Sequence, residues 1–351
     1  MNWRSTWEKL THWELWHYFV KYYFIAPCWL WYCLRSGSFW FFSSSNPTLT
    51  FGGFEGEGKK EMYDQLPAGT YPDTIYIFPG QEFNDIKKSL AYKKLSYPFI
   101  VKPDAGSKGL LFRKIDNEEE LLKYHQMMPV DYLAQALITY PLELGVFYYR
   151  FPNQQKGVIT GFIQKDLMDV IGDGKHNLLQ LIEQHPIAKF RIEELKLKHE
   201  NFFESIIPKG ERYILTYAAN LSRGARFTNL EHLIDEDLLK VFDEISHRTS
   251  FYYGRYDLKT VSVEDLKQGR NFSILEFNGS GAEPNHIYHK GLSLLQAYKV
   301  ILFHWKILYQ ISKYNHHHGY PYWSFKKGNK FLKEAKKHLR LLEQYEKEIL
   351  V

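Results

Sequence analysis

Charged and amide side chains alternate in two segments near the end of the chain. Arg255 and Asp257 belong to the segment GRYDLKTVSV, and Glu276 and Asn278 belong to NFSILEFNG. Because side chains alternate along a strand, two such strands lying side by side would gather all four groups on one face. Carboxylate and amide oxygens suit Mg²⁺, and a guanidinium suits the charge of a phosphoryl group in transfer. A solvated strand face with mixed charges is the alternative that this pattern leaves open.

A second set of residues is suited to phosphate. Lys102 lies in the β-rich run YPFIVKP, and the loop DAGSKG follows at 104–109 with Ser107 and Lys108. A lysine can reach phosphate oxygens, and the backbone N–H groups of a Gly/Ser-rich loop can surround them. The order of residues is not that of a Walker A loop. An ordinary β-hairpin turn is the alternative.

The segment that follows is suited to a nucleoside. An expected strand ending in AQALI offers Gln135 and the backbone from Ala136 to Ile138 to an adenine edge. Glu143, a short step further on, can accept hydrogen bonds from ribose hydroxyls. The alternative for Glu143 is an exposed glutamate after a turn, which is its usual environment.

These residues require a scaffold in which strands and helices follow one another irregularly. Strands are expected at 74–78, 97–103, 110–115, 132–138, 142–151, 157–165, 254–263 and 271–279. Helices are expected at 61–66, 82–95, 117–128 with Asn117 as N-cap, 178–184, 235–250, 291–313 and 327–349. This irregular alternation predicts an α+β fold.

Three motifs occur in one order: VKPDAGSKG, AQALITYPLE, and the pair GRYDLK and ILEFNG. Together they resemble the ATP-grasp superfamily, notably D-alanine–D-alanine ligase. The stretches FIQKDLMDVIGDGKHNLLQLI and NLSRGAR are also similar to the ATP-grasp region of cyanophycin synthetase. The resemblance covers roughly residues 55–290 and implies two α+β subdomains that clasp ATP. It implies an enzyme that activates a carboxylate with ATP and magnesium for attack by an amine.

The resemblance also implies roles for the residues above. Asp257, Glu276 and Asn278 would bind two magnesium ions, and Arg255 would steady the reacting phosphate. The remaining assignments run in chain order: Lys102 and the loop at 104–109 hold the phosphates, Gln135 and the backbone of Ala136 to Ile138 meet the adenine, and Glu143 meets the ribose.

Three further basic positions are implied in the same way. Lys165 matches a second lysine on the phosphate side, and Arg223 lies in a loop expected near the acyl phosphate. Either Lys59 or Lys60 matches a further nucleotide-side lysine.

Two departures from the superfamily pattern affect what the resemblance implies. Gln135 replaces the usual acidic residue, although a glutamine carbonyl can still accept a hydrogen bond from an adenine amino group. The Rossmann-like domain that usually precedes the nucleotide lysine, and helps to form the substrate site, has no room here. An aromatic arm and the loop NPTLTFGGFEGEGK occupy its place, so the substrates do not carry over.

The aromatic arm covers residues 1–45 and contains seven of the nine tryptophans. Its core, HYFVKYYFIAPCWLWYCL, has Lys21 inside it, and Pro27 would kink a helix. Tryptophan and tyrosine beside lysine and arginine suit the membrane–water interface. We expect either a kinked helical segment on the cytoplasmic leaflet or an arm packed against the protein's own core or a partner subunit.

The overall composition agrees with a globular enzyme: 351 residues, of which 44% are hydrophobic and 24% charged. The net charge of +5 favours anionic partners such as nucleotides or acidic lipid, and no nucleic acid is expected. Cys28 and Cys33 have no zinc-site spacing and form no disulfide framework, which fits a cytoplasmic protein. If the arm meets a membrane, the location is peripheral, on the cytoplasmic face.

These observations predict an ATP- and magnesium-dependent carboxylate–amine ligase acting through an acyl phosphate. Its substrates would be a carboxylate and an amine, either small molecules or lipid-linked. The expected organisation is an arm at 1–45, an ATP-grasp domain at 46–290 and a helical extension at 291–351. The alternatives are a small-molecule kinase on the same fold and a membrane-docked module that binds nucleotide without turnover.

Overall fold

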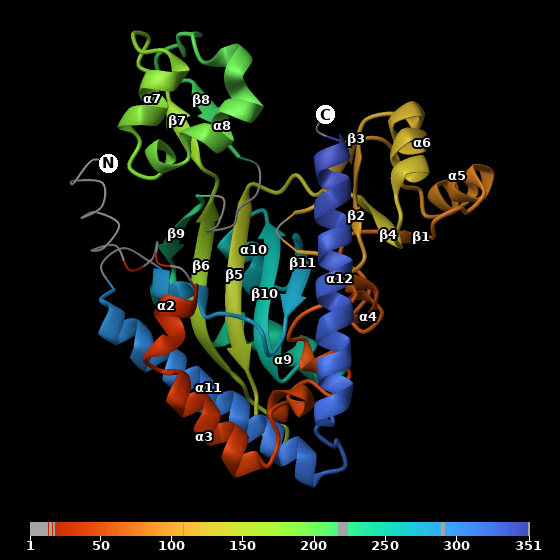
Figure 1. Ribbon diagram of the computed structural model, residues 1–351, viewed down its shortest axis with the longest axis vertical. Coiled ribbons are helices and arrows are strands. Elements are labelled where there is room, and N and C mark those ends of the chain that lie inside the picture. The colour runs from red at the N-terminus through yellow and green to blue at the C-terminus, as the bar shows by residue number, and fades with distance from the viewer. Residues whose placement is uncertain are drawn as a thin grey trace. The chain divides into compact units, whose positions relative to one another are not determined.

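The computed structural model describes residues 13, 16, 18–107, 109–216, 224–288 and 292–349. The chain divides into two compact units. Unit 1 consists of residues 1–163 and 229–351, and unit 2 consists of residues 164–228. Helices and strands are mixed along the chain, as expected for the predicted α+β fold (Figure 1). The predicted division at residues 45 and 290 stays a prediction.

The first sheet of unit 1 has four strands in the order β1-β4-β2-β3. Its strands are antiparallel: β1 (Thr74–Ile77), β2 (Phe99–Pro103), β3 (Arg113–Ile115) and β4 (Tyr132–Ala136). The helices α5 (Phe83–Tyr92) and α6 (Glu118–Met127) bury apolar side chains against one face. Val101 and Ala134 belong to that apolar face, so the alternating neighbours Lys102 and Gln135 point to the other face.

The second sheet has five strands in the order β11-β10-β5-β6-β9. Its strands are β5 (Leu142–Tyr149), β6 (Val158–Asp166), β9 (Arg226–Asn229), β10 (Tyr253–Thr260) and β11 (Phe272–Asn278). The strand β10 lies between β11 and β5 and is antiparallel to both. The chain passes from unit 1 into unit 2 within β6 and returns within β9.

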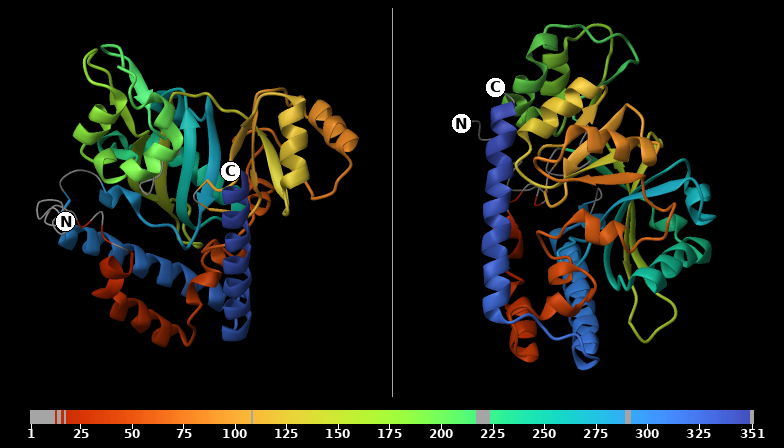
Figure 2. Two further views of the ribbon diagram at one scale, coloured as in Figure 1. Left: turned by 45° about the horizontal axis from the view of Figure 1, so that its top comes forward. Right: turned by 90° about the vertical axis from the view of Figure 1, so that its right-hand side faces the viewer.

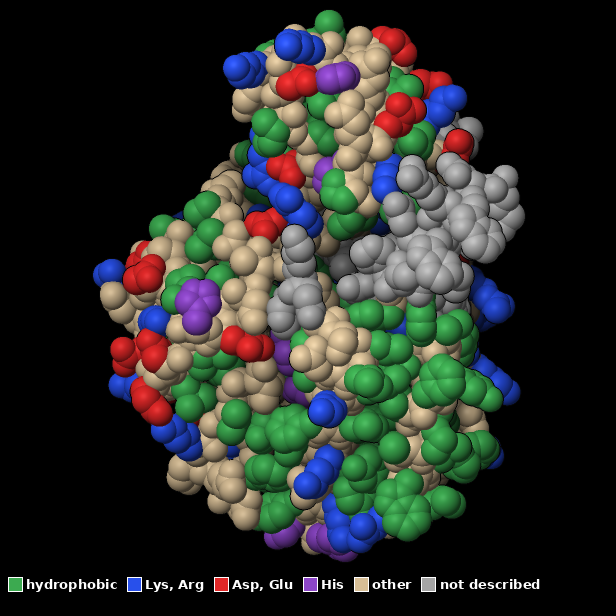
Figure 3. All heavy atoms as spheres, turned by 90° about the vertical axis from the view of Figure 1, so that its left-hand side faces the viewer, with side chains coloured by type: hydrophobic (Ala, Val, Ile, Leu, Met, Phe, Trp, Pro, Cys, Tyr) green, Lys and Arg blue, Asp and Glu red, His purple; other side chains and the backbone are tan. Residues whose placement is uncertain are grey.

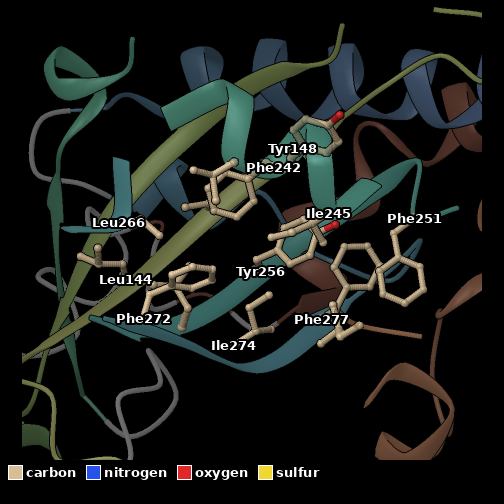
Figure 4. Close-up of a cluster of buried hydrophobic side chains, with 14 of the residues drawn as sticks. Leu144, Tyr148, Phe242, Ile245, Phe251, Tyr256, Leu266, Phe272, Ile274 and Phe277 are labelled. Carbon is tan, nitrogen blue, oxygen red and sulfur yellow. The ribbon is translucent and has the colours of Figure 1, made fainter. Parts of the chain in front are cut away.

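One face of the second sheet packs on two helices. Leu238, Phe242 and Ile245 of α9 (Glu236–Thr249) and Leu266 of α10 (Val263–Lys267) meet side chains of β5, β10 and β11 (Figure 4). Tyr256 and Phe277 are among these buried side chains. The residues on either side of them along each strand must therefore face the opposite way.

The other face of this sheet is covered in part by α11 (Leu294–His317). Against α11 lies α3 (Ala26–Ser36), which follows the short helix α2 (Tyr18–Tyr23) (Figure 2). Ring centroids of Trp29 and Trp305 are 5.1 Å apart, and those of Tyr32 and Tyr309 are 4.8 Å apart. The chain ends in α12 (Phe325–Ile349). One side of the arm is thus packed on the protein's own core. This packing was one of the two arrangements expected from the sequence.

Unit 2 has a small core of its own. β7 (Asp169–Ile171) and β8 (Arg212–Ile214) form a two-stranded antiparallel sheet. The helices α7 (Leu178–Gln184) and α8 (Ile192–His199) pack with this sheet around Met168, Leu178, Ile182, Leu195 and Phe203. A capping box between Asn177 and Gln180 starts α7, which fixes one end of the helix.

Every expected strand and helix is present, with shifts at the ends. The expected strand at 254–263 ends at Thr260, because Ser262 caps α10 by accepting a hydrogen bond from Asp265 N at 3.0 Å. Asn117 caps α6 as predicted, accepting from Glu120 N at 3.0 Å. The short elements β7, β8, β9, α8 and α10 were not predicted, because runs of three to eight residues carry little periodicity.

Candidate active site

The strands β10 and β11 lie side by side, as the alternating charges predicted. Asp257 stands directly opposite Glu276, and Arg255 stands opposite Asn278. Because Tyr256 and Phe277 point into the core, these four polar side chains share the opposite face of the sheet. On the neighbouring strand β5, Gly145 is the partner of Asp257. A Cβ at Gly145 would lie 3.1 Å from Ile163 Cγ1 and in ordinary contact with Asp257 Oδ1 at 3.5 Å, so Ile163 limits the space there.

Arg255 and Asp257 form an ion pair that further hydrogen bonds keep in place. Arg255 Nε donates to Asp257 Oδ1 at 3.1 Å, and a second guanidinium nitrogen donates to Asp257 Oδ2 at 3.3 Å. Arg255 also donates to the carbonyl oxygen of Glu283 at 2.9 Å, and Asn278 Nδ2 donates to Asp257 Oδ2 at 3.2 Å. Burial lowers the pKa of Arg255, but Asp257 outweighs this effect and the net pKa is raised. The guanidinium therefore stays charged, and its orientation is fixed.

The first residue of α4 (Lys59–Tyr63) joins this group. Lys59 Nζ lies 3.7 Å from Glu276 Oε1 and 3.4 Å from the carbonyl oxygen of Asp104. Lys60 instead pairs with Asp64 and lies over the ring of Tyr76. Of the two lysines left open by the sequence, Lys59 is therefore the one at the strand pair.

Lys102 lies on the first sheet, next to Tyr63. Its Nζ is 3.5 Å from Tyr63 OH and 5.8 Å from the centre of that ring. Burial lowers the pKa of Lys102 to about 8, although Glu276 and Asp104 act in the opposite direction. Lys59, Lys102 and Glu276 thus belong to one electrostatic cluster. Tyr63 was not predicted as a site residue, and the short helical pattern around it gave no signal.

Gln135 joins two strands of the first sheet. Its side chain is fully buried, with Nε2 donating to Thr74 Oγ1 at 2.8 Å and Oε1 accepting from Tyr63 OH at 3.5 Å. The first of these contacts ties β4 to β1. The expected contact of its side-chain carbonyl with an adenine amino group stays a prediction.

The other expected nucleoside contacts lie beside a cavity. Ala136 and Ile138 line a cavity of about 1010 Å³, together with Tyr76 and Phe272. The backbone there is partly engaged, because Ala136 N donates to the carbonyl oxygen of Asp73 at 2.9 Å. The cavity lining does not include Lys102, Asp257 or Glu276. It does include three other lysines, Lys60, Lys88 and Lys93.

Glu143 lies at the beginning of β5, opposite Lys259 of β10. Lys259 Nζ donates to the carbonyl oxygen of Ile138 at 3.3 Å. Glu143 and the expected adenine segment are therefore neighbours, which is the arrangement that a ribose contact requires. The ribose contact itself stays a prediction.

The four remaining expected residues lie elsewhere in the chain or outside its described part. Lys108 and Arg223 lie outside the described residues. Lys165 is buried on β6, but it belongs to unit 2. Ser107 is exposed in the loop after β2, where its carbonyl oxygen accepts from Leu110 N at 3.2 Å.

The C-terminal helix holds this loop, which the sequence did not predict. His338 Nε2 lies 2.8 Å from the carbonyl oxygen of Ala105, and Glu346 Oε2 accepts from Leu111 N at 2.7 Å. Glu346 also pairs with Arg113 at 3.3 Å, and Leu342 is fully buried. The contact of α12 with the loop at 104–111 depends on residues more than 200 positions apart, so no local pattern could indicate it.

The residues of this strand pair could bind a magnesium ion only together with ligands from a substrate. Within the described part of the chain, no group of three or more His, Cys, Asp or Glu side chains could hold a metal ion. Asp257 and Glu276 supply two carboxylates in register, and Asn278 supplies an amide oxygen. Magnesium commonly binds through one or two carboxylates and completes its shell with substrate phosphates and water. The donor set is therefore suited to Mg²⁺ carried by a nucleotide.

The solved structures that are similar to this chain include ligases. No protein-family model and no curated protein matches this sequence. Among solved structures, a bifunctional glutathione synthetase from Pasteurella multocida is 18% identical with a TM-score of 0.39, over 67% of this chain and 34% of that one. The D-alanine–D-alanine ligase from Coxiella burnetii is 9% identical with a TM-score of 0.42, over 74% and 58%.

A third similar structure is the ATP-grasp ligase PsnB complexed with minimal precursor. It is 11% identical with a TM-score of 0.36, over 70% of this chain and 57% of PsnB. The chain thus spans about a third of the glutathione synthetase and less than two thirds of the other two. These neighbours include an ATP-grasp ligase, and the sequence motifs resemble the ATP-grasp superfamily. Because each TM-score is below 0.5, we base the function on the site residues themselves.

Proposed function

We propose that the protein is an ATP- and magnesium-dependent carboxylate–amine ligase. The observation that carries this proposal is the strand pair, on which Asp257 faces Glu276 and Arg255 faces Asn278. A lysine beside Glu276 adds a further cation. Clustered hard oxygens and cations are what phosphoryl transfer from ATP requires, since its catalysis is mainly positioning and charge stabilisation.

The proposed reaction has two steps. The substrate carboxylate attacks the γ-phosphorus of ATP, which forms an acyl phosphate and releases ADP. The amine then attacks the acyl carbon, and phosphate leaves with the electron pair of the broken C–O bond while the amine loses a proton. Asp257, Glu276 and Asn278 would hold Mg²⁺, which when bound neutralises phosphate charge.

The protein's own cations complete this mechanism. Arg255, oriented by Asp257 and the Glu283 carbonyl, would stabilise the charge of the phosphoryl group in transfer. Lys59 and Lys102 would bind the other phosphate oxygens. The loop at 104–109, held by α12, would exclude water from the acyl phosphate.

Product analysis tests the reaction. Full-length protein is incubated with ATP, Mg²⁺ and a panel of carboxylates and amines, and ADP, phosphate and amide are quantified. We expect ADP formation that depends on both a carboxylate and an amine, with one phosphate released for each amide. A stable phosphoester without amide would establish the kinase instead. ATP binding without any turnover across the panel would favour the non-catalytic module.

We also propose that the protein works on the cytoplasmic surface of a membrane. The outer side of α2 and α3 and the segment after them expose large apolar side chains. These form the apolar arm face, defined by Phe19 (76% exposed), Tyr23 (73%), Phe24 (68%), Leu30 (51%), Trp31 (56%), Leu34 (77%) and Phe39 (57%). Figure 3 displays hydrophobic side chains gathered over this region, with lysine and arginine side chains among them. So large an apolar patch commonly marks an interaction site.

Neighbouring charges favour an anionic bilayer as the occupant. The exposed residues Lys299, Lys306 and Lys313 follow one another at intervals of seven along α11, so they lie near one stripe of that helix. Arg35 lies over the ring of Trp31, with its guanidinium carbon 5.9 Å from the ring centre. Aromatic and apolar side chains with flanking cations are typical of interfacial helices. Among the described residues, no helix is both long enough and apolar enough to span a bilayer.

Vesicle flotation tests this part of the proposal. Full-length protein should float with phosphatidylcholine vesicles that contain phosphatidylglycerol at low salt. The triple variant Trp31→Ser, Leu34→Ser, Phe39→Ser should stay at the bottom of the gradient. Tyr92→Ser is a matched control, because Tyr92 is 86% exposed on another helix. Failure of the wild type to float would refute the membrane proposal, and dimers in light scattering would assign the face to a second copy. If the protein floats, a lipid-linked amine becomes the proposed substrate.

A further inference from the structure

The loop that precedes Lys59 holds a buried carboxylate. Glu57 Oε2 is inaccessible to solvent and has no hydrogen-bond partner within the described part of the chain. A lone buried polar atom is costly, because burial removes its water without replacing the hydrogen bonds. Such an atom in a folded protein calls for a partner that arrives later.

The backbone around Glu57 is fixed on both sides. Gly56 has a φ of +80°, and a Cβ there would lie 2.8 Å from the Cβ of Ala335 on α12. A Cβ at Gly58 would lie 2.4 Å from Asp104 Oδ2. Lys60 N donates to Asp104 Oδ1 at 2.7 Å, which ties the start of α4 to the loop after β2. The backbone on both sides of Glu57 is therefore closely packed.

The electrostatic surroundings of Glu57 compensate its charge only in part. Burial raises the pKa of Glu57 to about 7; the backbone N–H of Glu57 itself lowers this pKa, Glu276 raises it and Lys59 lowers it. The ammonium group of Lys59 is shared with Glu276 and the carbonyl oxygen of Asp104. A further cation at Glu57 would thus be favoured, and the group lies within electrostatic reach of Glu276.

We propose that Glu57 binds the ammonium group of the amine substrate beside the phosphate-binding residues. This inference rests on the proposed ligase function, in which the amine must lie next to the acyl phosphate. A primary ammonium group carries one charge and donates hydrogen bonds, so one carboxylate can hold it.

The location of Glu57 has a consequence for substrate choice. Glu57 lies in the loop GGFEGEGKK, two residues before Lys59, and would supply the amine-binding group from this short loop. The protein would therefore select substrates that carry a positive charge.

A ligand-observed NMR titration tests the inference. Ethylammonium chloride is titrated into full-length protein with MgCl₂ and a non-hydrolysable ATP analogue, and n-propanol serves as an uncharged probe of similar size. We expect Glu57→Gln to weaken ethylammonium binding by about tenfold or more, as for loss of a charged hydrogen bond. n-Propanol should not distinguish the variant from the wild type. Glu55→Gln is the matched control, because Glu55 is exposed two residues earlier in the same loop.

The outcomes separate this inference from the ligase proposal. Equal ethylammonium affinity in wild type and Glu57→Gln overturns the amine site, even if the wild type binds nucleotide and turns over. A lowered affinity for Mg²⁺-nucleotide in Glu57→Gln, with ethylammonium binding retained, also overturns it and assigns Glu57 to metal. If Glu57→Gln does not fold, Glu57→Asp replaces it, with a shorter carboxylate and an expected intermediate affinity. Once an amine substrate is found, Glu57→Gln should raise its KM and leave kcat nearly unchanged.

Discussion

The strand-built and the loop-built parts of the site are organised by different forces. On β10 and β11, ladder hydrogen bonds and the buried Tyr256 and Phe277 fix where Asp257 and Glu276 point. In the loop before α4 and the loop after β2, position depends on close packing between glycines, Asp104 and α12. The first part therefore resists single substitutions at its edges, whereas the second can be loosened from a distance.

Removing a carboxylate from the strand pair should have the largest effect. Asp257→Asn and Glu276→Gln each keep the side-chain shape but remove the charge that would hold Mg²⁺. We expect ATP turnover to fall by at least about a hundredfold, with an unchanged circular dichroism spectrum. Steady-state ADP release measures this loss.

Glu264→Gln is the control for this comparison, because Glu264 is exposed on α10. It should turn over like the wild type. Wild-type rates in Asp257→Asn or Glu276→Gln, with Mg²⁺ present, would contradict the metal assignment. Such a result would remove the strand-built part from the mechanism.

Substitution of Lys102 should have the second-largest effect. We expect this effect on ATP binding and not on the chemical step alone. Lys102→Ala removes a buried cation from the phosphate side, so ATP affinity should fall about 10- to 100-fold. Isothermal titration calorimetry measures the change, with Lys114→Ala as an exposed control from the same sheet. Unchanged ATP affinity in Lys102→Ala would rule out its phosphate contact.

The lowered pKa of Lys102 predicts how binding depends on pH. Phosphate requires the protonated amine, and Lys102 loses its proton in the free protein above a pKa of about 8. ATP affinity should therefore be constant below pH 7 and fall above pH 8, by up to about tenfold per pH unit. Lys102→Arg should keep its affinity over this range, because arginine stays charged.

The same shift has the opposite sign for stability. Between pH 8 and the usual lysine pKa, the unfolded chain binds more protons than the folded chain, so the contribution of Lys102 to the free energy of unfolding rises with pH. Below pH 8 the buried ammonium is a cost. Lys102→Ala should thus not lower the melting temperature at pH 7. A large drop in melting temperature would mean that Lys102 has a structural role.

The sequence could predict the strand-built part of the site better than the loop-built part. Alternation along β10 and β11 placed Arg255, Asp257, Glu276 and Asn278 on one face, because strand periodicity is local and strong. It could not place Gln135, whose burial depends on Thr74 and Tyr63 from other elements. Nor could it indicate Glu57 or the contact of His338 with Ala105, since both depend on packing between distant segments.

The arm illustrates a second limit of composition. Its aromatic residues suited both a membrane surface and the protein's own core, and the sequence could not choose between them. In the structure Trp29 and Tyr32 pack on α11, whereas Trp31 and Leu34 of the same helix are exposed. Helical periodicity separates the two sides, because residues one or two positions apart point in different directions.

The smallest expected effect tests whether α12 controls the loop-built part from outside. His338→Ala removes the hydrogen bond to the Ala105 carbonyl, and Glu346→Gln weakens the contacts with Leu111 N and Arg113. Each contact is worth on the order of 1 kcal/mol, so ATP affinity should fall about threefold to tenfold in the double variant. Hydrogen exchange of the loop at 104–111 should become faster, while exchange of β10 stays the same. Glu343→Gln is the control, because Glu343 is exposed on α12. If the double variant changes neither loop exchange nor ATP affinity, α12 packs on the loop without holding it. In that case the loop-built part of the site would be as rigid as the strand-built part on β10 and β11.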